Sequence, residues 1–293
     1  MRALWTATGI LAVLQCMCSA NAQQTQPAMP AGQLVREVVY NELHDHQSHG
    51  YWRYWVERHT AKETRVEEQI ETADGPISQL TLTDGRPLSA EVQQQEQSRL
   101  ERLLSSPSEQ ARHLQEYEED EKRIGRILAL LPDAFLYTYA GKENGCYKLV
   151  FRPNPDYPAH SIEARIFHAM GGTLWVDARM KRLARLDARV QDNLDFGYGI
   201  LGRLYKGGWF QLERSQVSAN DWKTARLEVH MMGRALLVKS FAKETSEVRG
   251  GFAPVPSGMN LAQGMALLQQ TSASKPAADH PALITPSELA LRR

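Results

Sequence analysis

The stretch GGTLWVDARMKRLARLDARV, residues 171–190, decides the fold of this chain. In its second half, every second residue from Ala184 to Val190 is apolar, and charged residues stand between them. The β-rich run TLWV precedes them, and DARMKR separates the two runs as a turn. This pattern predicts a β-hairpin with one apolar face and one charged face. Something must cover the apolar face, either a helix, a second sheet or a ligand.

The same alternation recurs along the rest of the chain, in short runs separated by turn residues such as DGRP and KENG. Besides the hairpin, runs with this alternation lie at about 50–61, 64–72, 77–83, 134–141, 146–153, 161–169, 207–217, 223–232 and 233–245. Consecutive short strands with tight breaks form antiparallel sheets. The sequence therefore predicts a mainly β, α+β fold with about nine or ten antiparallel strands before Val248.

Helical patterns interrupt the strands in the N-terminal half. Apolar residues recur at helical spacing up to Leu43, which predicts a short first helix. Ser89 and Ser106 are favoured N-cap residues for two further helices rich in Gln, Glu and Arg, with Pro107 at the first position of the second. We expect Pro132 to end that second helix, because proline removes a backbone donor and clashes with the preceding turn.

The charge balance excludes one class of partner. The 293-residue chain has 34 Lys and Arg against 34 Asp and Glu, so its net formal charge is zero. Because phosphate binding needs a basic surface, we expect no nucleic acid. After the N-terminus, no stretch reaches the ~18 apolar residues that a membrane-spanning helix needs.

The N-terminus has the pattern of a secretory signal peptide: Arg2, an apolar run, and the small-x-small ending ANA. Cleavage after Ala22 predicts a periplasmic mature chain whose one cysteine, Cys146, cannot form an internal disulfide. The expected organisation is a signal peptide at 1–22, a flexible leader at 23–33, one domain at 34–252 and a mobile Pro/Ala/Ser-rich tail at 253–293.

No catalytic constellation stands out in the sequence. GYGILG, residues 197–202, matches the glycine pattern of dinucleotide-binding loops, but no helix follows to hold a pyrophosphate, so we interpret it as a bend. His44, His46 and His49 could bind a metal, although a polar loop between a helix and a strand explains the same residues. We predict no catalytic residue, no metal and no cofactor.

A larger feature is the apolar face shared by the strands. If the strands curl into an incomplete barrel with the helices as a lid, part of that face remains available to an apolar ligand. Burial of an acyl chain contributes ~0.8 kcal/mol per CH₂, so such a cavity needs no charged anchor. The candidate lining consists of aromatic and aliphatic residues: Trp52, Tyr54, Val56, Leu80, Leu82, Tyr147, Leu149, Phe151, Ile166, Trp175, Leu186, Leu227 and Val229.

The order of these elements resembles a known family. Together with GGTLWVDARMKRLARLDARV and WKTARLEVHMMGRALLVK, it is similar to the periplasmic lipoprotein carriers of the Lol pathway, the outer-membrane lipoprotein-sorting superfamily. In that superfamily one strand ends in a Trp-Val/Ile-Asp run, as residues 175–177 do here. The resemblance covers roughly residues 34–248. It implies an unclosed antiparallel barrel covered by helices, with an apolar cavity for acyl chains.

Three hypotheses follow from the sequence. The first is an exported, monomeric, non-enzymatic carrier or sensor of lipid or of an acylated protein, which can also meet an envelope membrane protein. The second is a structural or interaction protein of the envelope, with a filled core and no ligand. The third is a metal-dependent enzyme that uses His44, His46 and His49.

Overall fold

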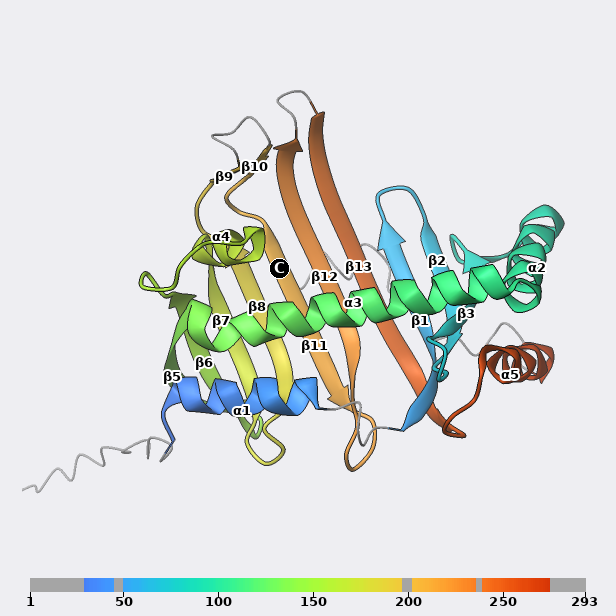
Figure 1. Cartoon of the computed structure of the whole chain (residues 1–293), viewed down its shortest axis with the longest axis horizontal. Coiled ribbons are helices and arrows are strands. Elements are labelled where there is room, and N and C mark those ends of the chain that lie inside the picture. Colours follow the sequence, from blue (N-terminus) through green and yellow to red (C-terminus); the bar gives the residue numbers. More distant parts are fainter. Residues whose placement is uncertain (1–28, 45–49, 197–201, 236–238, 275–293) are drawn as a thin grey trace, which may run out of the picture.

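The computed structural model describes residues 29–44, 50–196, 202–235 and 239–274 (Figure 1). Within these ranges the chain forms one 13-stranded sheet with the order β4-β3-β2-β1-β13-β12-β11-β8-β7-β6-β5; off this path, the short strand β10 pairs with β12, and β9 pairs with β10. Every ladder is antiparallel. The path ends at β4 and β5, so the described sheet stays open. The predicted fold class, an incomplete antiparallel barrel covered by helices, is confirmed.

The strands are β1 Tyr51–Thr60, β2 Thr64–Ile70, β3 Ile77–Thr83, β4 Arg86–Pro87, β5 Phe135–Glu143, β6 Cys146–Pro153, β7 Met170–Asp177, β8 Leu183–Val190, β9 Leu194–Phe196, β10 Gly202–Leu204, β11 Trp209–Gln216, β12 Trp222–Ala235 and β13 Lys239–Val255. The helices are α1 Ala31–Leu43, α2 Ala90–Ser105, α3 Pro107–Ala134, α4 Ile162–His168 and α5 Leu261–Ser274. The predicted strand number was too low, because β4, β9 and β10 have only two or three residues and are too short to show an alternation.

The hairpin that decides the fold forms as predicted, from β7 and β8. Leu174 lies opposite Leu186, and Gly172 lies opposite Ala188. The face of the sheet that carries these residues is called the inner face here, and the opposite face the outer face. Helices α1, α3 and α4 cover the inner face, and α3 crosses it from α2 to β5 (Figure 1).

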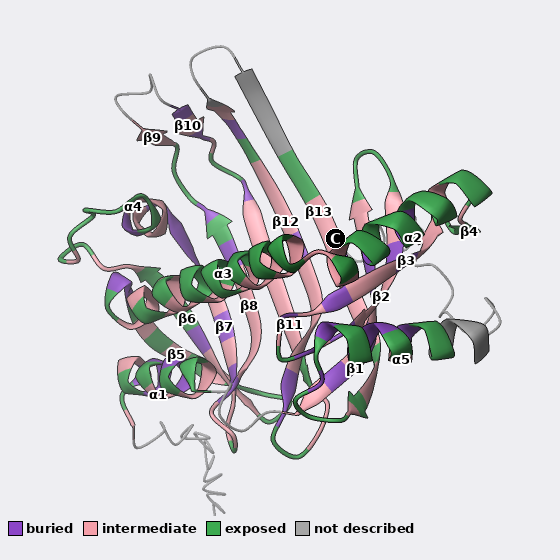
Figure 2. Ribbon diagram, turned by 45° about the vertical axis from the view of Figure 1, so that its right-hand side comes forward, coloured by how far each residue is buried: buried purple, intermediate pink, exposed green. Residues whose placement is uncertain are grey.

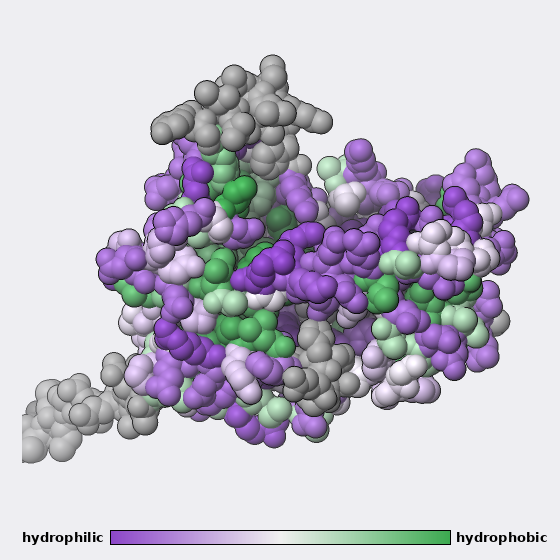
Figure 3. Space-filling model, in the orientation of Figure 1, coloured by the Kyte–Doolittle hydropathy of each residue, from purple (hydrophilic) through white to green (hydrophobic). Residues whose placement is uncertain are grey.

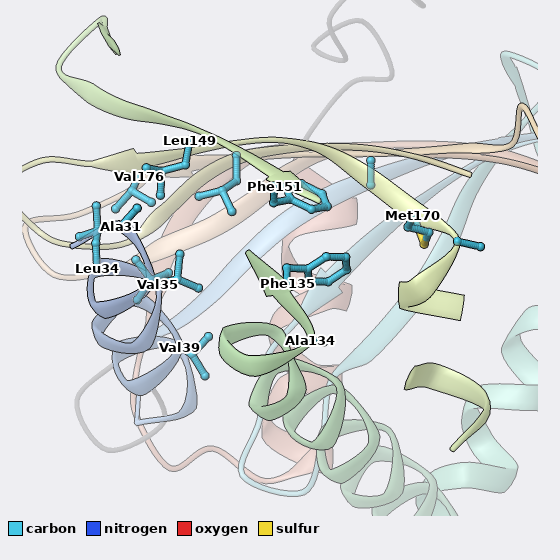
Figure 4. Close-up of a cluster of buried hydrophobic side chains, with 14 of the residues drawn as sticks. Ala31, Leu34, Val35, Val39, Ala134, Phe135, Leu149, Phe151, Met170 and Val176 are labelled. Atoms are coloured by element: carbon cyan, nitrogen blue, oxygen red, sulfur yellow. The ribbon is translucent and has the colours of Figure 1, made fainter. Parts of the chain in front are cut away.

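The main core lies where the inner face meets α1 and the C-terminal end of α3 (Figure 4). Leu34 and Val35 of α1 contribute two of its buried side chains, and Leu149 and Val176 of the sheet are fully buried. Phe135, directly after α3, packs its ring against Phe151 with centroids 4.9 Å apart. Since burial of each large apolar side chain contributes roughly 1.5–3 kcal/mol, this cluster anchors the helices to one end of the sheet.

Two helices begin with the predicted capping residues. The side chains of Ser89 and Ser106 accept hydrogen bonds from the backbone N–H groups of Val92 and Glu109, which starts α2 and α3. Pro132 does not end α3, which continues to Ala134. The prediction failed because only two residues follow Pro132, so the proline disturbs no more than the last turn.

The predicted strand at 161–169 is wrong, because this segment forms helix α4. Its apolar residues fit both a period of two and a helical turn, and a run this short does not separate the two. The N-cap decides the outcome: the Ser161 side chain accepts a hydrogen bond from the N–H of Ala164. The predicted strand at 233–245 also differs, since β12 continues to Ala235 and β13 begins at Lys239.

The folded domain extends past the predicted boundary at residue 252. Strand β13 ends at Val255, and α5 packs on the outer face of β2 and β3. Met265 and Leu268 of α5 are buried against Ile70 and Ile77. The Pro/Ala/Ser-rich composition predicted a mobile tail, but the apolar residues at helical spacing find an uncovered face of the sheet. Residues 275–293 lie outside the described residues.

Candidate functional site

A single row of leucines crosses the inner face. Direct cross-strand pairing aligns one leucine from each of β6, β7, β8, β11 and β12. These are Leu149, Leu174, Leu186, Leu212 and Leu227, called the leucine row below. With strands ~4.8 Å apart, the row is about 19 Å long.

Burial decreases along the leucine row. Leu149 and Leu174 are buried under the helices, whereas Leu186, Leu212 and Leu227 are only half-buried. Beside them, Phe210 and Val229 form a second directly opposed pair on the same face, also half-buried. These five half-buried residues, Leu186, Leu212, Leu227, Phe210 and Val229, are called the apolar trough. Figure 2 shows the same middle strands as intermediate rather than buried.

Helix α3 crosses the trough but does not fill it. Near its C-terminal end, Leu128 and Leu131 pack against the main core. Near its other end, His113 and Tyr117 lie close to Gly75 in the β2–β3 connection. Between these two contacts, Ile124 remains 52% exposed. Figure 3 shows apolar surface on both sides of this polar helix, over the middle of the sheet.

The leucine row ends at an ionic group. Beyond Leu227 on β12, the next residue in the row is Glu247 on β13, followed by Arg58 on β1. Glu247 is 5% exposed and accepts hydrogen bonds from Arg58 and Arg249. Arg249 also lies over the ring of Tyr54, 5.8 Å from its centroid. Two guanidinium groups on one carboxylate leave this end of the inner face with a local positive charge.

The electrostatics of this group follow from burial and from its neighbours. Burial alone would raise the pKa of Glu247, but Arg249 and Arg58 outweigh it and hold that pKa below its ordinary value. Burial raises the pKa of Tyr54 above its ordinary value, despite the attraction of Arg249. Glu247 is therefore a stable anion at neutral pH and Tyr54 a stable neutral phenol.

The predicted lining residues fall into several groups. Leu186, Leu227 and Val229 belong to the trough, and Leu186 also packs against the edge of the main core. Tyr147, Leu149, Phe151 and Ile166 belong to or pack against the main core. Trp52, Tyr54 and Val56 form a separate cluster with Val217 and Phe252, and Leu80 is buried beside α2. The ionic group at Glu247 thus separates the Trp52 cluster from the trough.

Two predicted lining residues lie on the wrong face. Trp175 is on the outer face, where it pairs with Lys148 and Arg185, because Leu174 and Val176 take the inner positions of β7. Leu82 is also on the outer face, since a register shift between β2 and β3 places it opposite Val66. The Trp175 error arises because alternation alone does not say which of two apolar faces is inward, and the Leu82 error arises because the register shift interrupts the alternation.

Phe210 and Leu212 of the trough are not among the predicted lining residues. The signal was present in WFQLER, where Phe210 and Leu212 alternate with Gln211 and Glu213. Trp209 precedes this alternation and lies on the outer face, in a stack with His230, so the run of two aromatic residues does not show which of them is inward.

The other chemical motifs contribute little to this site. His44 stacks on Tyr40 and its Nδ1 lies 2.7 Å from the carbonyl oxygen of Tyr40, while His46 and His49 lie outside the described residues. Among the described residues there is no cluster of three or more metal-ligating side chains. Most of GYGILG and the whole predicted signal peptide lie outside the described residues too. No helix in the described ranges is long and apolar enough to cross a membrane.

Comparisons with known proteins add little. No protein-family model matches the chain, and no curated protein matches it. Among solved structures, a DUF1329 family protein from Desulfovibrio piger overlaps 80% of this chain and 97% of its own, at 10% identity and a TM-score of 0.28. MucB in complex with MucA(peri) overlaps 77% of this chain and 99% of its own, at 10% identity and a TM-score of 0.21. TM-scores this far below 0.5 do not establish a common fold, so function must be argued from the site.

Proposed function

We propose that this chain is an exported, non-enzymatic carrier or sensor that binds an acyl chain of a lipid or an acylated protein in the apolar trough. The observation that carries the proposal is the leucine row, whose members become less buried toward the middle of the sheet. A continuous, half-buried apolar surface is costly to leave in water, and a ligand that covers it gains about 25 cal/mol per Å².

The dimensions of the trough suit one acyl chain. A bilayer core is ~30 Å thick, so one chain in a leaflet extends about 15 Å. The three half-buried leucines of the trough lie on adjacent strands and span about 10 Å, so they contact roughly two thirds of such a chain. Each methylene that leaves water contributes ~0.8 kcal/mol, so binding requires no hydrogen bond in the trough. The guanidinium of Arg58, whose side chain is 43% exposed at the end of the row, can meet a polar or anionic headgroup.

A second function is favoured by a different observation. Tyr40 and Leu43 of α1 and Ile124 of α3 are large apolar residues exposed to solvent by 62%, 37% and 52%. Leu43 lies against Gly125, next to Ile124, so the two helices share one exposed apolar surface. Such surfaces mark protein interaction sites, and an envelope interaction protein is therefore the alternative proposal.

The experiment that separates the two is mass spectrometry of an organic extract from the chain lacking residues 1–22, purified from periplasm without detergent. If the chain is a carrier, the extract contains lipid in a stoichiometric amount. After the lipid is removed, the protein takes up a fluorescent fatty acid. Protein that contains no lipid and takes up no fatty acid would contradict it. In that case, crosslinking in cells at Tyr40→Cys would identify the partner that the alternative requires.

A further inference from the structure

The outer face carries a pocket that the proposed lipid site does not use. It has a volume of about 260 Å³ and lies over β7, β8 and β11, on the side of the sheet away from α3. Its lining residues are Gly172, Thr173, Asp187, Ala188, Arg189, Trp209 and Gln211. The volume is slightly below the ~300–1,000 Å³ of pockets for drug-sized ligands, which indicates a ligand of about one ring.

Strand register explains why a hollow forms here. Thr173, Asp187 and Gln211 lie side by side in one cross-strand row and make the floor. In the neighbouring row, Arg189 and Trp209 lie opposite each other and form the wall beside this floor. Larger side chains, Trp209 among them, stand on either side of the short floor residues.

Trp209 supplies an aromatic wall. It lies between Arg189 on β8 and His230 on β12. The His230 ring stacks on it with centroids 6.0 Å apart and an interplanar angle of 14°, which fixes the indole from the β12 side. Because Trp209 also lines the pocket, its other side is available to a ligand.

The polar groups of the floor and rim can both donate and accept. Asp187 is held by Arg185 through two hydrogen bonds of 3.0 and 2.8 Å, which leaves lone pairs on its oxygens. Arg189 is exposed and forms no ion pair with any residue that the structure describes. Thr173 offers a hydroxyl and Gln211 an amide. One acid and one base make the lining neutral.

The indole wall and the polar floor together favour one class of ligand. A purely apolar ring would leave the floor groups buried without hydrogen bonds, which costs roughly 1–3 kcal/mol for each group. A phosphate would contact the Asp187 carboxylate. A pyranose sugar has one apolar C–H face, which fits an indole, and a hydroxyl edge that pairs with carboxylate, amide and guanidinium groups. We propose that the pocket at Trp209 binds a neutral pyranose ring of an oligosaccharide.

The test uses the ¹⁵N-labelled chain lacking residues 1–22, titrated separately with chitotetraose and maltotetraose. The indole N–H signal of Trp209 is assigned by its loss in Trp209→Leu. We expect at least one sugar to shift that signal in a saturable manner, and Trp209→Leu to weaken binding by about tenfold. Trp55→Leu removes a half-buried outer-face tryptophan of β1, three strands away from β11; it is the matched control and should bind within about twofold of wild type.

Two results would overturn the proposal: neither sugar moves the Trp209 signal, or Trp209→Leu binds as wild type does. If Trp209→Leu fails to fold, Gln211→Ala replaces it, with the same readout on the sugar signals and an expected loss of several-fold. Because the pocket and the apolar trough lie on opposite faces, sugar binding tests this site independently of fatty-acid uptake.

Discussion

Leu227 on β12 lies directly opposite Glu247 on β13, and this pair divides the inner face of the sheet into an apolar half and an ionic half. On one side of the pair, the leucine row runs to the main core. On the other side, Arg58 and Arg249 surround a carboxylate that is almost completely buried. A surface with these two halves side by side suits an amphiphile better than a purely apolar or a purely charged ligand.

The first prediction tests the apolar half. Leu227→Asn introduces a polar side chain of similar size into the half-buried trough, so we expect fatty-acid affinity to fall at least about tenfold, as ~1.4 kcal/mol of contact is lost. A fluorescent fatty-acid titration measures it. Val150→Asn is the matched control, because Val150 is 46% exposed on the outer face of β6. Equal affinities for the two variants would contradict the assignment of the trough.

The second prediction concerns the stability of the ionic half. Glu247→Gln removes the one carboxylate that Arg58 and Arg249 share, and leaves Arg249 with an uncompensated charge. Loss of one partner from a buried pair costs about 3–5 kcal/mol, and the partial exposure of Arg58 lowers the expected loss to about 2–3 kcal/mol. Urea unfolding at pH 7 measures it. Glu63→Gln, at an exposed pair with Arg65, should change stability by less than about 1 kcal/mol.

The third prediction follows from the lowered pKa of Glu247. Since the folded state holds this pKa below its ordinary value, the contribution to stability is complete above the unfolded pKa of about 4.3 and disappears as the pH falls through the lower folded pKa. The difference in unfolding free energy between wild type and Glu247→Gln should therefore narrow as the pH falls below about 4. Urea titrations at pH 7, 5, 4 and 3 provide the comparison, and a constant difference would show that Glu247 is not the titrating group.

The sequence predicted the sheet well because its strongest signal is local. The hairpin of β7 and β8 needs only the alternation around Leu186 and a turn, and the N-caps Ser89 and Ser106 act within one helical turn. The site was predicted less well because it depends on register between distant strands. A shift between Val66 and Glu67 sends Leu82 to the outer face, and no pattern within β3 reveals that shift.

The position of helix α5 also depends on contacts between distant parts of the chain. Composition predicted a mobile tail, whereas Met265 and Leu268 are buried on strands almost 200 residues earlier in the chain. We expect Leu268→Ala to cost about 2–5 kcal/mol, as for other fully buried leucines. Gln269→Ala, at the exposed neighbouring position, should be close to neutral. Thermal unfolding of both variants checks this, and a neutral Leu268→Ala would restore the tail interpretation.

The last prediction returns to the central hairpin. A Cβ atom added at Gly172 would lie 1.9 Å from the backbone oxygen of Asp187, a distance that only a movement of the backbone can relieve. Because Gly172 lies opposite Ala188, between the main core and the trough, that movement would separate β7 from β8. We therefore expect Gly172→Ala to destabilise the chain by more than about 3 kcal/mol, although the change adds one methyl group.

Thr173→Ala, one residue further along β7, removes atoms from the outer face and should cost less than about 1 kcal/mol. Chemical unfolding of the two variants compares them directly, and a Gly172→Ala protein as stable as wild type would mean that the two strands lie further apart than the register requires.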